Sequence, residues 1–152
     1  MWIHAAVNIS PELRVHNIPF PASSTRRHAR ERALELLYEA EMKSLSVADV
    51  LDSQTIPPDA YTSEIIRGIE KNLTFIDEKI SSVSKDWAFE RLAVVDRQLL
   101  RIAAYEIYFV GDVPMAVAID EAIELAKQFS TEDSPKYING ILGALGNGNT
   151  TT

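Results

Sequence analysis

One basic cluster stands out in a chain of 152 residues with a formal net charge of −7: Arg26-Arg27-His28-Ala29-Arg30-Glu31-Arg32. The cluster begins a stretch with helical periodicity, and cations in the first turn of a helix are disfavoured by ~0.3–1 kcal/mol each. Arginines at this position therefore favour a polyanionic partner, because guanidinium groups neutralise phosphates. The alternative is a solvated surface on which Arg30 and Arg32 pair with Glu31, Glu35 or other acids. The cluster by itself leaves both interpretations open.

The second candidate is the loop at residues 130–134, which precedes a predicted helix. It carries Glu132 and Asp133, and the free N–H groups of a helix start attract negative charge. The favoured interpretation is that these acids satisfy the helix terminus themselves. In a nucleic-acid site they would instead accept hydrogen bonds from bases, with the rings of Phe129 and Tyr137 as stacking surfaces. Phe129 also lies on the apolar stripe of its helix, so its ring has a competing role in the core.

Catalytic and metal-binding patterns are weak. The histidines are His4, His16 and His28, and their spacing matches no metal-ligand motif. The acids at positions 120, 121 and 124 share a predicted helix, but the Glu-x-x-His partner of a carboxylate metal site is missing. The sequence also has no cysteine, no glycine-rich phosphate loop and no GxSxG motif. We therefore expect no catalytic residues, no metal and no cofactor, and a protein that is not an enzyme.

Apolar residues at helical spacing predict the elements that must position these groups. The main predicted helices cover residues 25–45, 59–72, 91–110, 114–129 and 134–145, with a further turn at 47–51 and a short continuation to residue 83. No alternating strand pattern occurs, so the predicted fold class is all-α. The helix at 91–110 is apolar on most sides, which places it at the centre of a bundle. We expect its charged residues to be paired at the edge of the bundle: Asp96, Arg97, Arg101 and Glu106.

Local signals refine the ends of these helices. Ser24 or Thr25 is a candidate N-cap for the first helix, and Ser134 for the last one. The short connection at Gly111-Asp112 predicts that the two helices it joins are antiparallel. Gly140 is interpreted as a helical residue that allows close approach of another backbone, at a cost of ~1 kcal/mol relative to alanine.

Length and composition agree with one helical domain. We expect an irregular or disordered extension at residues 1–24, a folded domain at 25–146 and a flexible polar tail at 147–152. No apolar run approaches the ~20 residues of a membrane-spanning helix, so a soluble protein without a membrane partner is expected. The missing cysteines are compatible with the reducing cytoplasm, which is the expected location.

Three segments together resemble the NusB family of bacterial transcription antitermination factors: RRHARERALELLYE at 26–39, RLAVVDRQLLRIAAYEI at 91–107 and DVPMAVAIDEAIELAKQFSTEDSPKYINGIL at 112–142. The resemblance implies a compact bundle of two packed helical subdomains, with about six to seven helices, and a non-enzymatic function. It also implies binding to the boxA element of nascent RNA together with NusE, a small-subunit ribosomal protein. The resulting complex would help RNA polymerase bypass termination, notably in ribosomal RNA operons.

Matching positions extend the resemblance to individual residues. The implied RNA contacts are Arg26, Arg27, Arg30, Phe75, Phe129, Asp133 and Tyr137, and the implied NusE contacts are Tyr38 and Glu90. His28 takes the third basic position of the family's arginine motif, and a histidine is mostly neutral at pH 7. The chain before Thr25 departs from the family, whose members usually begin close to the arginine motif.

Two other interpretations stay open. The first is a helical module that binds only proteins, either a ribosomal protein or a second copy of itself, and never contacts RNA. The second is a NusB-like domain of the kind attached to some ribosomal RNA methyltransferases. That interpretation is disfavoured because the sequence contains no cofactor-binding βαβ unit.

Overall fold

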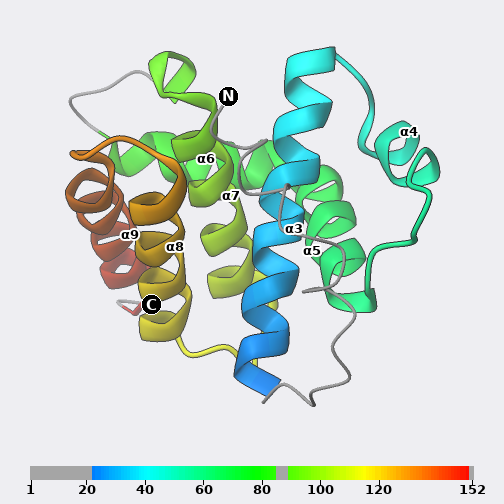
Figure 1. Ribbon diagram of the computed structural model, residues 1–152. Coiled ribbons are helices and arrows are strands. Elements are labelled where there is room, and N and C mark those ends of the chain that lie inside the picture. Colours follow the sequence, from blue (N-terminus) through cyan, green and yellow to red (C-terminus); the bar gives the residue numbers. More distant parts are fainter. Residues whose placement is uncertain (1–21, 85–88, 151–152) are drawn as a thin grey trace.

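Helices make up most of the chain that the computed structural model describes, which is residues 22–84 and 89–150 (Figure 1). Seven α-helices and one 3₁₀ helix occur in these two ranges, without any strand. They are α3 (Ala22–Lys43), α4 (Val47–Asp52), α5 (Ala60–Lys71), α6 (Leu73–Val83), η1 (Phe89–Arg91), α7 (Val94–Phe109), α8 (Met115–Phe129) and α9 (Ser134–Thr150). The predicted all-α class is confirmed. None of the helices in the described ranges combines the length and apolarity of a membrane-spanning segment.

Helix α7 forms the centre of the bundle, as its apolar pattern predicts. It lies between α3 and α5 on one side and α8 and α9 on the other, and it packs against all four (Figure 1). Its side chains are buried on several sides, and Leu99, Leu100 and Ala104 are at most 1 % exposed. The molecule is therefore two packed groups of helices that share one core through α7.

Asp96, Arg97, Arg101 and Glu106 of α7 all have ion-pair or hydrogen-bond partners, but they do not all lie at the edge of the bundle. Arg97 and Arg101 form the expected ion pairs, with acids of α3 and α6. Glu106, by contrast, is 1 % exposed and pairs inside the bundle. Asp96 is also buried, and it accepts hydrogen bonds from serine hydroxyls. The predicted edge position is therefore wrong for Asp96 and Glu106.

The first helix begins and ends earlier than predicted, and the last helix is longer than predicted. Helix α3 already includes Ser24 and Thr25, so neither is its N-cap. Helix α9 continues to Thr150, through most of the segment predicted as a tail. A Cβ at Gly146 would lie 2.2 Å from Sδ of Met115, so α9 packs closely against α8 at the residue before the predicted tail. Residues 1–21 of the predicted extension and residues 151–152 lie outside the described ranges.

Close packing between α5 and α7 occurs at a different glycine from the predicted one. Gly140 is helical, but a Cβ there would meet nothing within 4 Å, so the expected close approach is wrong. At Gly68 on α5, a Cβ would lie 2.2 Å from Cε1 of Tyr105 on α7. The Tyr105 ring is 8 % exposed and stacks on Phe109, so it has little room to move. Gly68 therefore sets how closely α5 packs against α7.

We predict that Gly68→Ala lowers the free energy of unfolding by ~1–3 kcal/mol, because the added methyl group overpacks the contact between α5 and α7. Gly140→Ala is the matched control. It adds the same group at an exposed helical position and should raise the free energy of unfolding by ~0.5–1 kcal/mol. Urea unfolding followed by circular dichroism measures both changes. Equal effects of the two substitutions would contradict the role assigned to Gly68.

Candidate nucleic-acid interface

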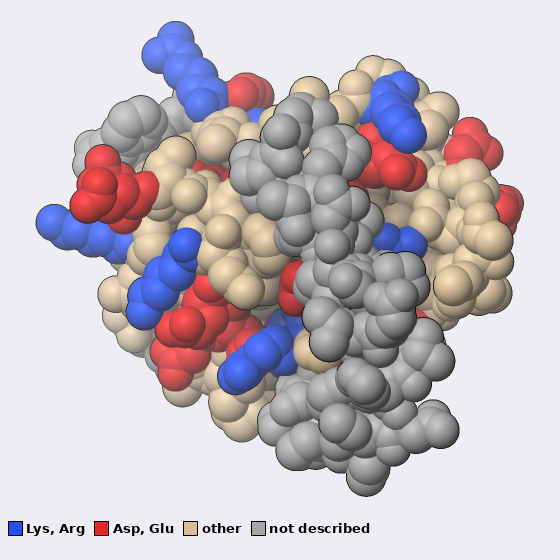
Figure 2. Space-filling view, viewed as in Figure 1, with Lys and Arg blue, Asp and Glu red and all other residues tan. Residues whose placement is uncertain are grey.

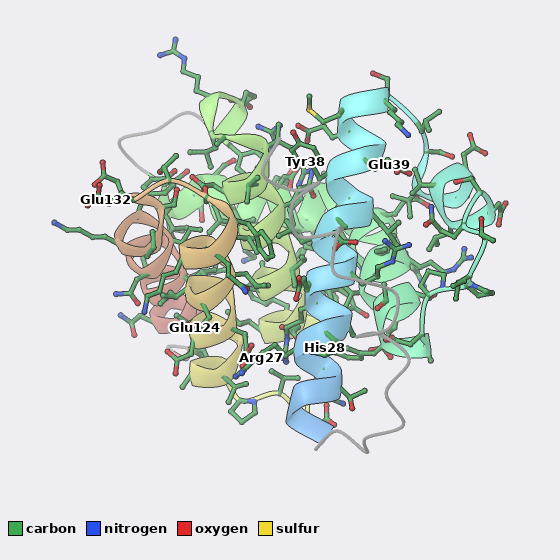
Figure 3. All side chains as sticks on the ribbon, viewed as in Figure 1. Arg27, His28, Tyr38, Glu39, Glu124 and Glu132 are labelled. Carbon is green, nitrogen blue, oxygen red and sulfur yellow. The ribbon has the colours of Figure 1, made fainter. Side chains whose placement is uncertain are left out.

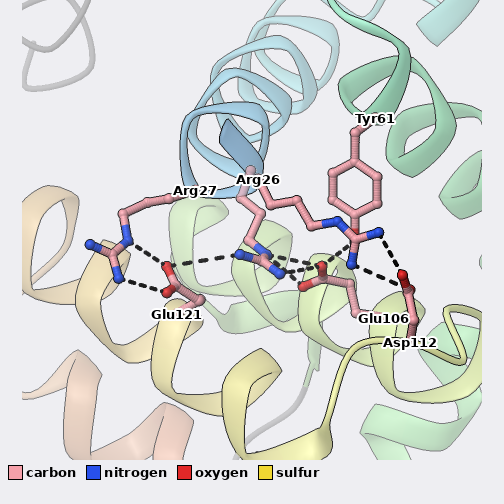
Figure 4. Close-up of polar contacts among 7 residues, drawn as sticks. Arg26, Arg27, Tyr61, Glu106, Asp112 and Glu121 are labelled. Atoms are coloured by element: carbon pink, nitrogen blue, oxygen red, sulfur yellow. Dashed lines mark hydrogen bonds and ion pairs between the residues drawn. The ribbon is translucent and has the colours of Figure 1, made fainter. Parts of the chain in front are cut away.

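The predicted arginine motif lies on the second and third turns of α3, against acids from distant parts of the chain (Figure 4). The cost expected for cations in a first helical turn therefore does not apply to it, because α3 begins at Ala22. Arg26 donates to Asp112, with Nη2 2.9 Å from Oδ2. Arg27 donates to both carboxylate oxygens of Glu121, with Nη2 at 2.8 Å and Nε at 3.0 Å. These contacts join residues 86 and 94 positions apart. They attach the start of α3 to the turn before α8 and to α8 itself.

Arg30, the third arginine of the motif, is buried. It is 3 % exposed, and its Nε and Nη2 each lie 2.9 Å from an oxygen of Glu106. The hydroxyl of Tyr61 donates to the same carboxylate, and burial together with this hydrogen bond raises the pKa of Tyr61. Removing one partner of a buried ion pair leaves the other charge uncompensated. Arg30 is therefore held as part of the fold, and its burial conflicts with the expected direct contact to RNA.

Arg26 and Arg27 keep exposed guanidinium surface. Their side chains are 34 % and 56 % exposed, and the Arg26 guanidinium lies 4.6 Å from the ring centre of Tyr61. The hydrogen bond from Arg26 holds the pKa of Asp112 below its ordinary value. The hydrogen bond to Glu121 raises the pKa of Arg27, which also favours the charged form. Both arginines are thus charged, accessible to solvent and already bound to a carboxylate.

A hollow of about 360 Å³ lies beside these ion pairs. Its lining residues are Arg26, Arg30, Asp112, Val113, Pro114, Val117 and Glu121. On the face shown in Figure 2, basic and acidic side chains lie next to one another rather than in one extended basic area. Among the described residues, no three histidine or acidic side chains gather as metal ligands would. The chemistry available here is therefore anion binding by arginines that also contact acids.

The loop between α8 and α9 is held in place by a buried acid of α7. Ser130 and Ser134 donate their hydroxyls to Asp96, with oxygen–oxygen distances of 2.6 and 2.9 Å. The Ser134 hydroxyl also contacts Thr131 in the loop. The hydrogen bonds of Ser134 therefore hold the loop against α7. The sequence had instead predicted Ser134 as the N-cap of the last helix. This role of Asp96 was not predicted.

Asp133 and Tyr137 lie together at a hollow of about 280 Å³ between this loop and the start of α7. Asp133 is exposed, and Tyr137 is half-buried. Burial raises the pKa of Tyr137, and the nearby negative charge of Asp96 raises it by a smaller amount. A carboxylate that can accept hydrogen bonds beside an aromatic ring is suited to an unpaired base. The structure thus brings two of the predicted RNA-contacting residues together.

The two predicted phenylalanines do not join Asp133 and Tyr137 at this edge. Phe129 is 7 % exposed and belongs to the hydrophobic core, as its place on the apolar stripe indicated. Phe75 is 41 % exposed, and its ring centre lies 5.3 Å from that of Tyr108 and 5.6 Å from that of Phe109. Phe75 therefore belongs to an aromatic cluster of α6 and the end of α7.

Comparison with known proteins decides the family. The sequence model of the NusB family matches residues 27–147. The chain belongs to the NusB family. A relative from Arthrobacter sp. (strain FB24), named transcription antitermination protein NusB, is 46 % identical over 126 residues. The match covers 80 % of this chain and 93 % of that NusB protein.

Solved structures agree with the NusB assignment. NusB from T. maritima is 36 % identical, with a TM-score of 0.74, and the match covers 86 % of this chain and 93 % of that one. A chain in a crystal structure of the antitermination factors NusB and NusE in complex with dsRNA has a TM-score of 0.68 at 23 % identity. That match covers 81 % of this chain and 96 % of the other. At this lower identity, the likeness concerns the NusB fold alone.

The NusB resemblance assigns a partner surface to Tyr38 and Glu90, away from the arginine motif. Tyr38 follows Arg26 by 12 residues on α3, which is about 18 Å along a helix. Figure 3 shows Tyr38 and Arg27 toward different ends of α3. Tyr38 packs partly buried against the core, and Glu90 is exposed in η1. Their contact with a partner protein stays a prediction.

We predict that Arg30→Ala lowers the free energy of unfolding by ~3–5 kcal/mol, because Glu106 would stay buried without its cation. Arg27→Ala is the control, since its side chain is 56 % exposed and its partner Glu121 keeps Arg30 4.0 Å away. The double variant Arg30→Met/Glu106→Leu should recover most of the loss, because it removes both buried charges. Urea unfolding compares the three variants. A loss for Arg27→Ala as large as that for Arg30→Ala would rule out the distinction between them.

Proposed function

We propose that this chain is a transcription antitermination factor that binds boxA RNA of nascent transcripts together with NusE and helps RNA polymerase bypass termination. The observation that carries the proposal is the pair Arg26 and Arg27, which present guanidinium groups at the start of α3 in a chain of net charge −7. Membership of the NusB family supports it, since a relative 46 % identical is named an antitermination protein. Such a factor acts on nascent bacterial RNA in the cytoplasm and needs no catalytic residue, metal or cofactor.

Two parts of the surface divide the work of recognition. Arg26 and Arg27 bind phosphates, which gives affinity that does not depend on RNA sequence. Asp133 accepts hydrogen bonds from the edge of an unpaired base, and the Tyr137 ring stacks on a base. Because Asp96 binds the loop through two serine hydroxyls, this edge is ordered before RNA arrives. The loop therefore loses less conformational entropy when RNA binds, which lowers the free-energy cost of binding.

The remaining predicted residues have other roles in this proposal. Arg30 positions the other two arginines from inside the protein through its pair with Glu106. Phe129 supports the loop from the core. Phe75 offers a stacking surface to a longer RNA, because its ring is 41 % exposed beside Phe109. In the same proposal, Tyr38 and Glu90 contact NusE.

We predict that the double variant Arg26→Gln/Arg27→Gln weakens boxA binding about tenfold or more and reduces the salt dependence by about one unit per lost phosphate contact. Tyr137→Leu should weaken binding about fivefold or more at unchanged salt dependence, because it removes stacking but no charge. Fluorescence anisotropy titrations at several salt concentrations measure both. Lys43→Gln, at the far end of α3, is the control for the loss of one positive charge outside the motif. Unchanged binding by the double arginine variant would overturn the RNA site and favour a module that binds only proteins.

A second prediction concerns NusE. BoxA RNA should bind more tightly when NusE is present, because the two proteins share one RNA. Glu90→Gln and Tyr38→Ala should reduce this tightening and leave RNA affinity without NusE unchanged. Glu124→Gln on α8 serves as the control. The same titrations with and without NusE measure the effect, and light scattering reports the species formed. Binding of NusE, or a homodimer, without any change in RNA affinity would contradict the joint site.

A further inference from the structure

We infer that Glu121 and Asp112 act as internal competitors for RNA phosphate: they occupy Arg27 and Arg26 in the free protein and so limit its affinity for RNA. The inference rests on the proposed function, because it concerns how the arginine motif is regulated. It follows from one geometric fact. Each solvent-accessible arginine of the motif already donates two hydrogen bonds to a carboxylate of α8 or of the turn before it.

The contact between Arg27 and Glu121 uses the donors that a phosphate would use. Nε and Nη2 of Arg27 lie 3.0 and 2.8 Å from the two oxygens of Glu121, which is the forked arrangement by which arginine binds carboxylates and phosphates alike. A phosphate can take the same two donors only if Glu121 gives them up. The remaining Nη1 alone would bind an RNA phosphate less firmly.

The exchange is feasible because the acid keeps another cation beside it. The Glu121 side chain is 11 % exposed, whereas that of Arg27 is 56 % exposed, so Arg27 is the partner that can swing outward. Nη1 of Arg30 lies 4.0 Å from Oε2 of Glu121. When Arg27 leaves, Glu121 therefore still faces a buried positive charge. No isolated buried carboxylate results, which would be strongly unfavourable.

Arg26 and Asp112 form the second and more exposed pair. Arg26 donates from Nη1 at 3.3 Å and from Nη2 at 2.9 Å, and the Asp112 side chain is 71 % exposed. Once released, Asp112 is hydrated by solvent, and Arg26 keeps its place over the Tyr61 ring. This pair therefore exchanges with a phosphate without disturbing the core. A substitution of Asp112 can therefore test the inference even if a substitution of the less exposed Glu121 disturbs folding.

The opposite role for these acids is positioning, in which they hold the arginines in the orientation that RNA needs. The two roles predict opposite signs. If the acids compete, removing their charge strengthens RNA binding. If they position the arginines, removing their charge weakens it. The direction of the change in RNA affinity therefore decides between them.

The experiment measures boxA RNA binding to the full chain by fluorescence anisotropy at one fixed salt concentration. Glu121→Gln and Asp112→Asn should each tighten binding about two- to fivefold, the range expected for release of one exposed ion pair. Glu124→Gln is the matched control, because it removes the same charge one turn further along α8, where the acid pairs with Lys127 and attracts Arg27 only at longer range, without a hydrogen bond. It should change affinity less than twofold. In an Arg27→Gln background, Glu121→Gln should have no further effect.

The outcomes separate the inference from the proposed function. Weaker binding by both acid variants, or tightening by Glu124→Gln equal to theirs, would overturn the inference while RNA binding itself stands. A wild-type protein that does not bind boxA RNA would overturn the proposed function and the inference with it. Thermal unfolding by circular dichroism checks each variant. Asp112→Asn decides the question if Glu121→Gln does not fold.

Discussion

The buried ion pair between Arg30 and Glu106 is the constraint on which the rest of the interface depends. It joins α3 to α7, and the Tyr61 hydroxyl joins α5 to the same carboxylate. Residues three and four positions apart share one face of a helix, so holding Arg30 in the interior also determines where Arg26 and Arg27 emerge. The exposed arginines are thus positioned by a charge that solvent scarcely reaches.

A second buried acid does the same for the loop near the other end of α7. Asp96 lies in the first turn of α7 and Glu106 in its last turn. A buried carboxylate is stable only when its hydrogen bonds are made, so each of these acids requires partners from a neighbouring segment. Glu106 takes arginine and tyrosine, and Asp96 takes the hydroxyls of Ser130 and Ser134. Through these two residues, the central helix supports both parts of the proposed RNA site.

The helices were predictable because apolar periodicity is a local property of the sequence, and this includes the central place of α7 and the core role of Phe129. The extent of α9 was not predictable in the same way, because Gly146, just past the predicted end of the helix, packs against Met115, which lies far away in sequence. The burial of Arg30 was missed for the same reason, since its partner Glu106 lies 76 residues later. A signal did exist. A glutamate on a helix that is apolar on most sides needs a buried cation, and the motif was the densest source of cations.

Internal pairing of the arginines bears on how an RNA-binding protein selects its target. Arginine–phosphate contacts are nearly the same for every RNA, and so is the displacement of Glu121 and Asp112 that must precede them. The displacement therefore weakens binding to all RNAs by a similar factor and leaves the ratio of their affinities unchanged. Where other RNA is in large excess, however, a lower common affinity reduces the fraction of protein held on the wrong sites. An RNA that also places a base against Asp133 and Tyr137 gains contacts that offset the displacement, so stable binding depends more on these base contacts although the ratio of affinities is the same.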